Sequence, residues 1–195
     1  MNLQTQNSWI YVSNFFIIQM SDKLKINHKP GSTSAEIFLR NVKTTGNQYT
    51  LGGEYGYTIV IQPESDDVET LLELFNEFAA KHAETHEGLK AGYNPIKKEE
   101  GTFKISWDVD RKSTTWTNVH GEELERNPVL ADNGCISVAI EVWSRAYEKN
   151  GDMQLAINCH PAQIRVHSLG DAQAGINGAF DDWMGDDSLS STEDF

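Results

Sequence analysis

An alternation of apolar and polar residues with a period of two recurs in separate segments of this 195-residue chain. It is clearest in residues 55–62 and 102–110, where every second residue is aromatic or aliphatic. Because successive side chains of a strand point to opposite faces, this pattern predicts strands with one buried face. Strands and helices do not follow each other regularly along the chain, which argues against a parallel α/β sheet.

A single segment, residues 65–89, carries a clear helical pattern. Apolar residues recur there at helical spacing, with glutamates on the other side. Asp66 and Glu69 have the spacing of a capping box, which predicts the start of the helix. Gly88 or Gly92 supplies a stop. The apolar residues are Val68, Leu71, Leu72, Phe75, Phe78 and Ala79.

Further strands are predicted from short apolar runs separated by turn residues. A proline within such a run interrupts the ladder, so Pro161 is expected to divide the last two strands. Five or six antiparallel strands with one inserted α-helix make a mainly β protein. This set favours an antiparallel barrel like the oligonucleotide- and oligosaccharide-binding (OB) fold. The additional strands are expected at residues 37–42, 136–142, 153–158 and 164–166.

Changes in composition divide the chain into three parts. The hydrophobic run at residues 9–20 is too short to span a bilayer and does not resemble a signal peptide. The character of the sequence changes abruptly at Met20. We therefore expect residues 1–20 to form an N-terminal extension outside the core, residues 21–170 an OB-fold-like domain, and residues 171–195 a flexible acidic tail.

The last fifteen residues contain six acidic residues and no basic one, and they end on Phe195. A terminal ring beside carboxylates suits a partner that has an apolar pocket rimmed by lysine or arginine. The same segment also suits self-docking onto a basic groove, where carboxylates imitate phosphates. A tail that only improves solubility is the third interpretation.

The overall charge and the cysteines limit the classes of function. A formal net charge of −13 counts against strong electrostatic binding of duplex DNA. It leaves open a binder that stacks bases on aromatic rings, because stacking needs only a local basic groove. Cys135 and Cys159 are too few and too far apart for a disulfide framework, which favours a reducing cytoplasm.

Signals for catalysis are weak, and we expect no cofactor, no metal and no enzymatic activity. The chain has neither a phosphate-binding glycine loop nor a nucleophile elbow. His82 and His86 stand four residues apart, but without the arrangement of a zinc protease. Asp108 and Asp110 share a strand face and are candidates for a magnesium site, which keeps a metal-dependent nuclease as an alternative.

Signals for nucleic-acid binding are stronger. Rings interleaved with cations are what a groove for a single strand needs, because rings stack on bases and cations meet phosphates. Trp116 is the best stacking candidate, since the polar residues around it offer no partner for burial. The candidates are Lys98, Lys104, Trp107, Arg111, Lys112 and Trp116, with Tyr55 and Tyr57.

A second basic stretch lies near the N-terminal end of the domain. It holds five cations against only Asp22 and Glu36, so local charge is positive within an acidic protein. The cations are Lys23, Lys25, Lys29, Arg40 and Lys43.

Tail, barrel and groove together resemble the single-stranded-DNA-binding replication proteins of podovirus-type bacteriophages. The resemblance rests on the ending Ser-Thr-Glu-Asp-Phe195, on the early helix between strands, and on the carboxyl half of the domain. That half reads Asn127-Pro-Val-Leu-Ala-Asp132, then Gly134-Cys-Ile-Ser-Val-Ala-Ile, Tyr147, Gly151, Leu155-Ala-Ile and Ala162-Gln163-Ile.

The resemblance implies a protein that coats single-stranded DNA during phage replication and recombination, in the cytoplasm of the infected bacterium. It implies that the tail recruits the DNA polymerase and the helicase–primase and competes with DNA for the groove. It also implies that the protein forms a homodimer and has no membrane partner. The tail residues concerned are Asp186, Asp187, Glu193, Asp194 and Phe195. A phage structural or carbohydrate-binding β-domain is the alternative.

Overall fold

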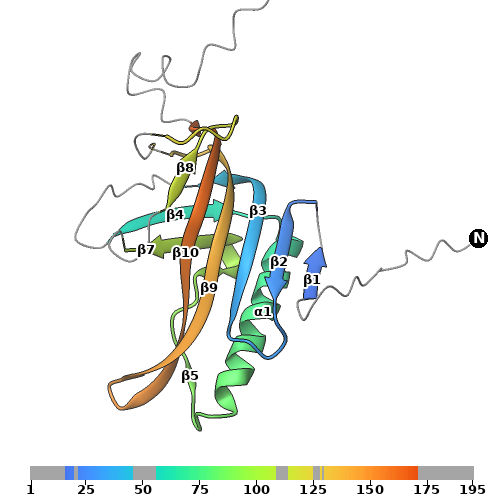
Figure 1. Cartoon of the computed structure of the whole chain (residues 1–195). Helices are drawn as coiled ribbons and strands as arrows, with labels where there is room; N and C mark the ends of the chain where they lie inside the picture. The colour runs from blue at the N-terminus through green and yellow to red at the C-terminus, as the bar shows by residue number, and fades with distance from the viewer. Residues whose placement is uncertain are drawn as a thin grey trace, which may run out of the picture.

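The computed structural model describes residues 16–19, 22–45, 56–108, 114–124, 128 and 130–170. Within these residues the protein is mainly β, with a single α-helix packed along an open sheet (Figure 1). The strands are β1 (Phe16–Gln19), β2 (Leu24–His28), β3 (Ser34–Thr44), β4 (Tyr57–Gln62), β5 (Lys90–Ala91), β6 (Ile96–Lys97), β7 (Thr102–Trp107), β8 (Thr115–Thr117), β9 (Cys135–Lys149) and β10 (Asp152–Ser168). The helices are α1 (Ser65–Ala83) and the short 3₁₀ helix η1 (Lys98–Glu100).

The hydrogen-bonded sheet has the order β5-β10-β9-β3-β4-β7-β6. β2 pairs with residues 35–39 of β3, on the side away from β9, while β4 pairs with residues 43–44; β1 pairs with β2, and β8 adds to β10. β9 and β10 form a long hairpin that extends past the rest of the sheet (Figure 1). β7 also contacts β10, although among the described residues no ladder of hydrogen bonds joins these two strands.

The long strand β10 corrects one prediction. Pro161 was expected to end a strand, yet β10 runs continuously from Asp152 to Ser168. The chain absorbs the proline at a register shift between Pro161 and Gln163, where a β-bulge tolerates the missing N–H. The Pro161 carbonyl still accepts a hydrogen bond of 2.8 Å from the Thr114 hydroxyl.

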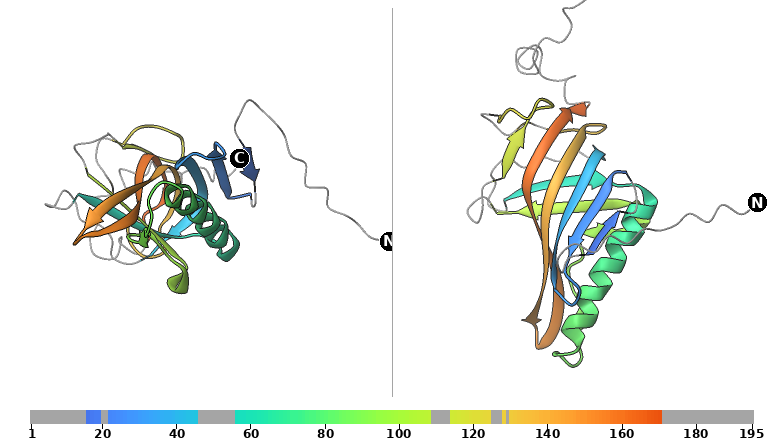
Figure 2. Two further views of the ribbon diagram at one scale, coloured as in Figure 1. Left: turned by 90° about the horizontal axis from the view of Figure 1, so that it is seen from below. Right: turned by 45° about the vertical axis from the view of Figure 1, so that its right-hand side comes forward.

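Helix α1 is shorter than its sequence pattern predicts, and its predicted cap is wrong. It ends at Ala83, and the N-cap is Glu64, which makes no side-chain capping bond. Its apolar side faces the core, while His82 Nε2 lies 3.0 Å from Ser144 Oγ on β9. Figure 2 shows α1 along one side of the sheet, next to the β2–β3 edge.

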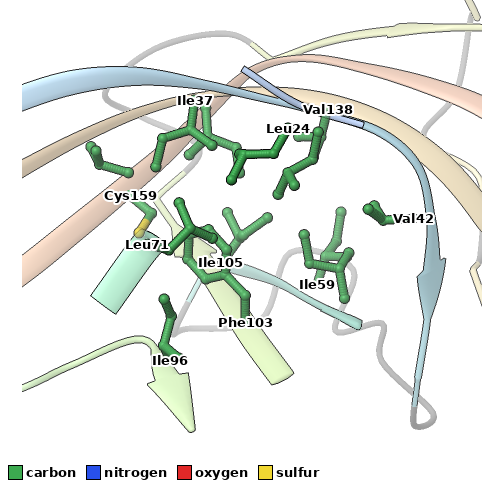
Figure 3. Packing of buried hydrophobic residues seen from close by; sticks show 14 of the residues in the cluster. Leu24, Ile37, Val42, Ile59, Leu71, Ile96, Phe103, Ile105, Val138 and Cys159 are labelled. Carbon is green, nitrogen blue, oxygen red and sulfur yellow. The ribbon is translucent and has the colours of Figure 1, made fainter. Parts of the chain in front are cut away.

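The core lies between the sheet and α1 and is built from the alternate residues that the sequence pattern identified (Figure 3). Ile59, Phe103 and Ile105 are at most 1% exposed. Burying each such side chain stabilises the fold by roughly 1.5–3 kcal/mol. These residues fix which face of β4 and β7 is internal, and therefore which face remains for a ligand.

The two ends of the described chain bear on the predicted domain boundaries. β1 pairs with β2 in antiparallel register, so residues 16–19 join the edge of the sheet. An N-terminal extension outside the core stays a prediction, and residues 171–195 lie outside the described part. In the described part, no helix is both long and apolar enough to cross a membrane.

Candidate nucleic-acid interface

The structure brings Tyr57 and Trp107 together on the inner side of two paired strands. Tyr57 on β4 lies opposite Trp107 on β7, with ring centroids 5.3 Å apart. Trp107 is buried and Tyr57 is half-buried. Tyr57 therefore covers the tryptophan at the end of the core. The Tyr57–Trp107 pair supports the neighbouring outer face of the two strands.

That outer face is the candidate interface, and we call it the β4–β7 face. Its residues alternate with the buried ones, and their side chains are exposed or half-buried. Thr58 Oγ1 and Ser106 Oγ form a hydrogen bond of 3.0 Å across the ladder. Lys104 lies opposite Val60 and is exposed. The β4–β7 face consists of Thr58, Val60, Gln62, Lys104 and Ser106.

Tyr93 borders this face from the loop before β6, and the sequence analysis missed it. It is 46% exposed, and a hydrogen bond links it to the Ser106 side chain. Burial of part of its ring raises the pKa of Tyr93, with Cys159 adding to the shift and the Ser106 bond opposing it. An exposed ring anchored to Ser106, two residues along β7 from Lys104, can stack on a base while the ammonium group meets a phosphate.

The segment carrying Tyr93 is fixed by backbone contacts to both β10 and β7. β5 pairs with Gln154 and Leu155, and the Tyr93 carbonyl accepts the Ile157 N–H at 2.9 Å. The Pro95 carbonyl accepts the Lys104 N–H at 2.9 Å. The segment thus bridges β10 and β7 and positions Tyr93 rigidly. No periodic pattern marks it, because its bonds are made by the backbone.

Two predicted residues occupy other environments. The exposure expected for Trp116 is wrong: the ring is 2% exposed within the hydrophobic core, because β8 pairs with β10 and turns the indole inward. Lys98 lies in η1, where its Nζ is 3.6 Å from Glu69 Oε1 on α1. The structure therefore does not bring these two side chains to the β4–β7 face.

Several predicted residues lie outside the described part of the chain, so their placement is not stated. Asp110 of the predicted magnesium pair is among them. Within the described ranges, no group of histidine, cysteine or acidic residues is placed to hold a metal ion. The site residues concerned are Tyr55, Arg111, Lys112, Asp186, Asp187, Glu193, Asp194 and Phe195.

Two further half-buried rings lie on β9, towards the tip of the hairpin. Trp143 and Tyr147 alternate with the buried Ser144, and the Tyr147 hydroxyl donates to Gln154 Oε1 at 3.1 Å. The guanidinium carbon of Arg145 lies 5.9 Å from the centre of the Tyr147 ring. Their alternation with the core positions of β9 was the signal that could have identified them.

Comparison with known proteins agrees with this architecture. No family model matches the chain, and no curated protein matches its sequence. The C-terminally truncated single-stranded DNA-binding protein from bacteriophage Enc34 superposes with a TM-score of 0.50 and 15% identity, over 79% of this chain and 95% of that chain. The Enc34 protein in complex with single-stranded DNA gives 0.50 and 15%, over 80% and 97%.

The single-stranded DNA binding protein gp2.5 of bacteriophage T7 gives a TM-score of 0.46 at 14% identity, over 73% of this chain and 97% of that chain, which is too low to carry an argument. The Enc34 structures at 0.50 are sufficient for the fold. The chain therefore shares the fold of bacteriophage single-stranded-DNA-binding proteins, as the resemblance in its sequence predicted.

Proposed function

We propose that this protein binds single-stranded DNA without enzymatic activity, through a barrel of the OB type. Following the ladders from β3 gives β4 and β7 on one side and β9 and β10 on the other, and β7 contacts β10. This order matches the one expected for a five-stranded OB barrel, with α1 inserted between the second and third strands, and it supports the proposal. In that fold, the face of the second and third strands binds oligonucleotides.

The observation that carries the proposal is the chemistry of the β4–β7 face, which corresponds to the face of the second and third strands. Lys104 supplies a cation that forms no ion pair within the described residues. Tyr93 supplies an exposed ring anchored to Ser106, two residues further along β7. A ring and a cation side by side bind base and phosphate without reading sequence.

The residues beside this face in the sequence complete the proposed interface. Tyr55 precedes β4, and Arg111 and Lys112 follow β7 within five residues. We include these three as DNA contacts. Trp107 and Trp116 enter as packed support, because their burial leaves no open ring for a base.

The proposed biological role follows from the fold likeness to phage proteins whose described ligand is single-stranded DNA. The protein would coat and protect single strands during phage replication and recombination, in the cytoplasm of the infected host. The acidic segment Asp181–Phe195 would recruit the replicative polymerase and the helicase–primase and compete with DNA for the groove. A homodimer is part of the same proposal.

The test is fluorescence anisotropy of a labelled oligo(dT) titrated with the full chain. Lys104→Glu is compared with Lys81→Glu, an equal charge change at an exposed position of α1. The proposal predicts weaker binding by Lys104→Glu alone, by about tenfold, since a cation at a phosphate becomes a repelling anion. Equal affinities for the two variants would remove the β4–β7 face from the proposal.

The tail is tested separately with a synthetic peptide of residues 181–195 added in trans. Competition for the groove predicts that the peptide displaces labelled oligo(dT) at low salt, and that a peptide with its carboxylates replaced by amides does not. Displacement by neither peptide would leave the tail without a role in DNA binding.

A further inference from the structure

The outer side of β2, β3, β9 and β10 carries a group of exposed cations that the β4–β7 face does not use. In the sheet register, Lys25 lies opposite Phe38, Lys43 opposite Cys135, and Ser137 opposite Arg165. The residues between them on each strand, such as Leu39 and Val138, are buried in the core. We call Lys25, Phe38, Arg40, Lys43, Ser137 and Arg165 the basic sheet face.

The cations of this face have no acidic partner in the described part of the chain. Among the described residues, Lys25, Arg40, Lys43 and Arg165 form no ion pair. Five other lysines are paired with carboxylates on or near α1 and at the hairpin end. Those are Lys23, Lys81, Lys90, Lys97 and Lys98. Four unpaired cations of the described residues thus gather on this side of an acidic protein, in addition to others such as Lys104 on the β4–β7 face.

Acidic residues border the basic sheet face instead of interrupting it. Glu36 on β3 lies opposite Glu141 on β9, one outward-facing row below Phe38. Glu36 accepts a hydrogen bond of 3.2 Å from Asn27. A row of carboxylates beside a row of free cations confines a polyanion to the cationic side.

The face also offers a ring beside a cation. Phe38 is half-buried, and Lys25 Nζ lies 5.6 Å from the centre of its ring. This arrangement gives a base a surface to stack on, with a cation at the distance of the neighbouring phosphate.

The basic sheet face is continuous with the β4–β7 face. Lys43 on β3 lies directly opposite Gln62 on β4, and both are exposed. Val60, two residues before Gln62, lies opposite Lys104 on β7. With strands about 4.8 Å apart, three steps of roughly 14 Å in total lead from β7 through β4 and β3 to β9.

Resting on the function proposed above, we propose that the basic sheet face is a second contact surface for single-stranded DNA, onto which a strand continues from the β4–β7 face. Charge complementarity and continuity with the first face support this occupant. A flexible single strand can follow the curved outer side of the sheet, whereas a stiff duplex cannot bend over so short a path.

The experiment compares a short and a long oligo(dT) on the full chain. A strand of about four nucleotides, the lower limit of an OB site, covers the β4–β7 face alone, and one of about thirty reaches beyond it. The double variant Lys43→Gln/Arg165→Gln removes two exposed cations of the face. The matched control is Lys29→Gln/Lys81→Gln, two exposed lysines in the β2–β3 turn and on α1.

For the long strand, the double variant should bind about tenfold more weakly than the control. Its slope of log K against log salt should fall by about 1.4, that is about 0.7 for each lost cation. For the short strand the two variants should agree. Equal affinity and slope for the long strand would overturn the proposal. Tighter binding would also overturn it, as expected if residues 171–195 occupied the face. Absence of binding to either strand by the unaltered chain would instead refute the proposed function.

A footprint on the unaltered protein gives a second readout. Cys135 lies beside Lys43 on the outer side and is half-buried, whereas Cys159 is buried in the core. The long strand should slow alkylation of Cys135 several-fold, and the short strand should not. Equal rates with both strands would contradict a DNA path over this face.

Discussion

Tyr57 on β4 and Trp107 on β7 face each other across the ladder, with ring centroids 5.3 Å apart. The pair closes the end of the core directly beneath the β4–β7 face. Aromatic residues in this part of the sequence therefore serve two purposes. Trp107 and Trp116 are buried and stabilise the fold, whereas the Tyr93 ring is exposed to solvent.

The burial of Trp116 predicts a loss of stability on truncation. Trp116→Ala should lower the free energy of unfolding by about 3–5 kcal/mol, because it leaves a cavity where a ring was packed. Urea unfolding followed by circular dichroism measures this change. A stable Trp116→Ala protein that bound oligo(dT) much more weakly would mean that the indole stacks on DNA instead.

The exposure of Tyr93 predicts the opposite behaviour. Tyr93→Ala should weaken binding to oligo(dT) by about 1–3 kcal/mol, the value of one base stack, with little change in stability. Tyr93→Phe keeps the ring and loses only the bond to Ser106, so it should bind nearly as well. Equal weakening by both variants would assign the effect to the hydroxyl.

Gly92 allows the segment before Tyr93 to approach β10 closely. A Cβ atom at this position would lie only 2.2 Å from the Leu155 carbonyl oxygen. Gly92→Ala should therefore push the segment away from β10 and lower the free energy of unfolding by about 1–3 kcal/mol. Because the segment carries Tyr93, the variant should also weaken DNA binding, as Tyr93→Ala does. Thermal unfolding and anisotropy check the two effects. Gly88→Ala measures the cost of a positive φ (+72°) without a clash, because a Cβ there would meet nothing within 4 Å.

His167 predicts a dependence of stability on pH. Its Nε2 lies 2.8 Å from Ser137 Oγ, and the Asn41 N–H donates to the same oxygen at 3.1 Å. Burial, and then the charge of Arg165, lower the pKa of His167. The unfolded chain binds a proton more readily near pH 6.5, so the free energy of unfolding should fall as pH decreases through this value.

His167→Gln should lose that part of the pH dependence, while its stability above pH 7 changes little. Urea unfolding midpoints between pH 5 and pH 8 measure it. The same slope in the variant as in the unaltered chain would assign the pH dependence to other groups.

Much of the fold was predictable from the sequence because the alternation of apolar and polar residues shows which side chains of a strand are buried. The strands at residues 57–62 and 102–107 carry their buried positions at every second residue, as expected. The prediction that Pro161 divides two strands is wrong because a bulge in the β9–β10 hairpin accommodates the proline. That bulge depends on pairing with β9, which the local sequence does not reveal. The predicted exposure of Trp116 is wrong because the strand that pairs with its own, β10, lies far along the chain.

The candidate site was predictable only in part. Lys104 was predicted because it alternates with the apolar residues of its strand, and its exposure agrees with that alternation. Tyr93 was not predicted because its position depends on backbone hydrogen bonds from the segment to Ile157 and Lys104. Such bonds leave no pattern in the side chains. The basic stretch around Arg40 and Lys43 was noticed, but its union with Arg165 required the β3–β9–β10 register.

The most direct test of the central claim is a titration of labelled oligo(dT) with the full chain over a series of salt concentrations, beside a duplex of equal length. We expect saturable binding to the single strand that weakens with added salt, and weaker binding to the duplex, because the chain carries a net charge of −13 and would depend on local groups of cations. The absence of binding to the single strand at low salt, or a preference for the duplex, would contradict it.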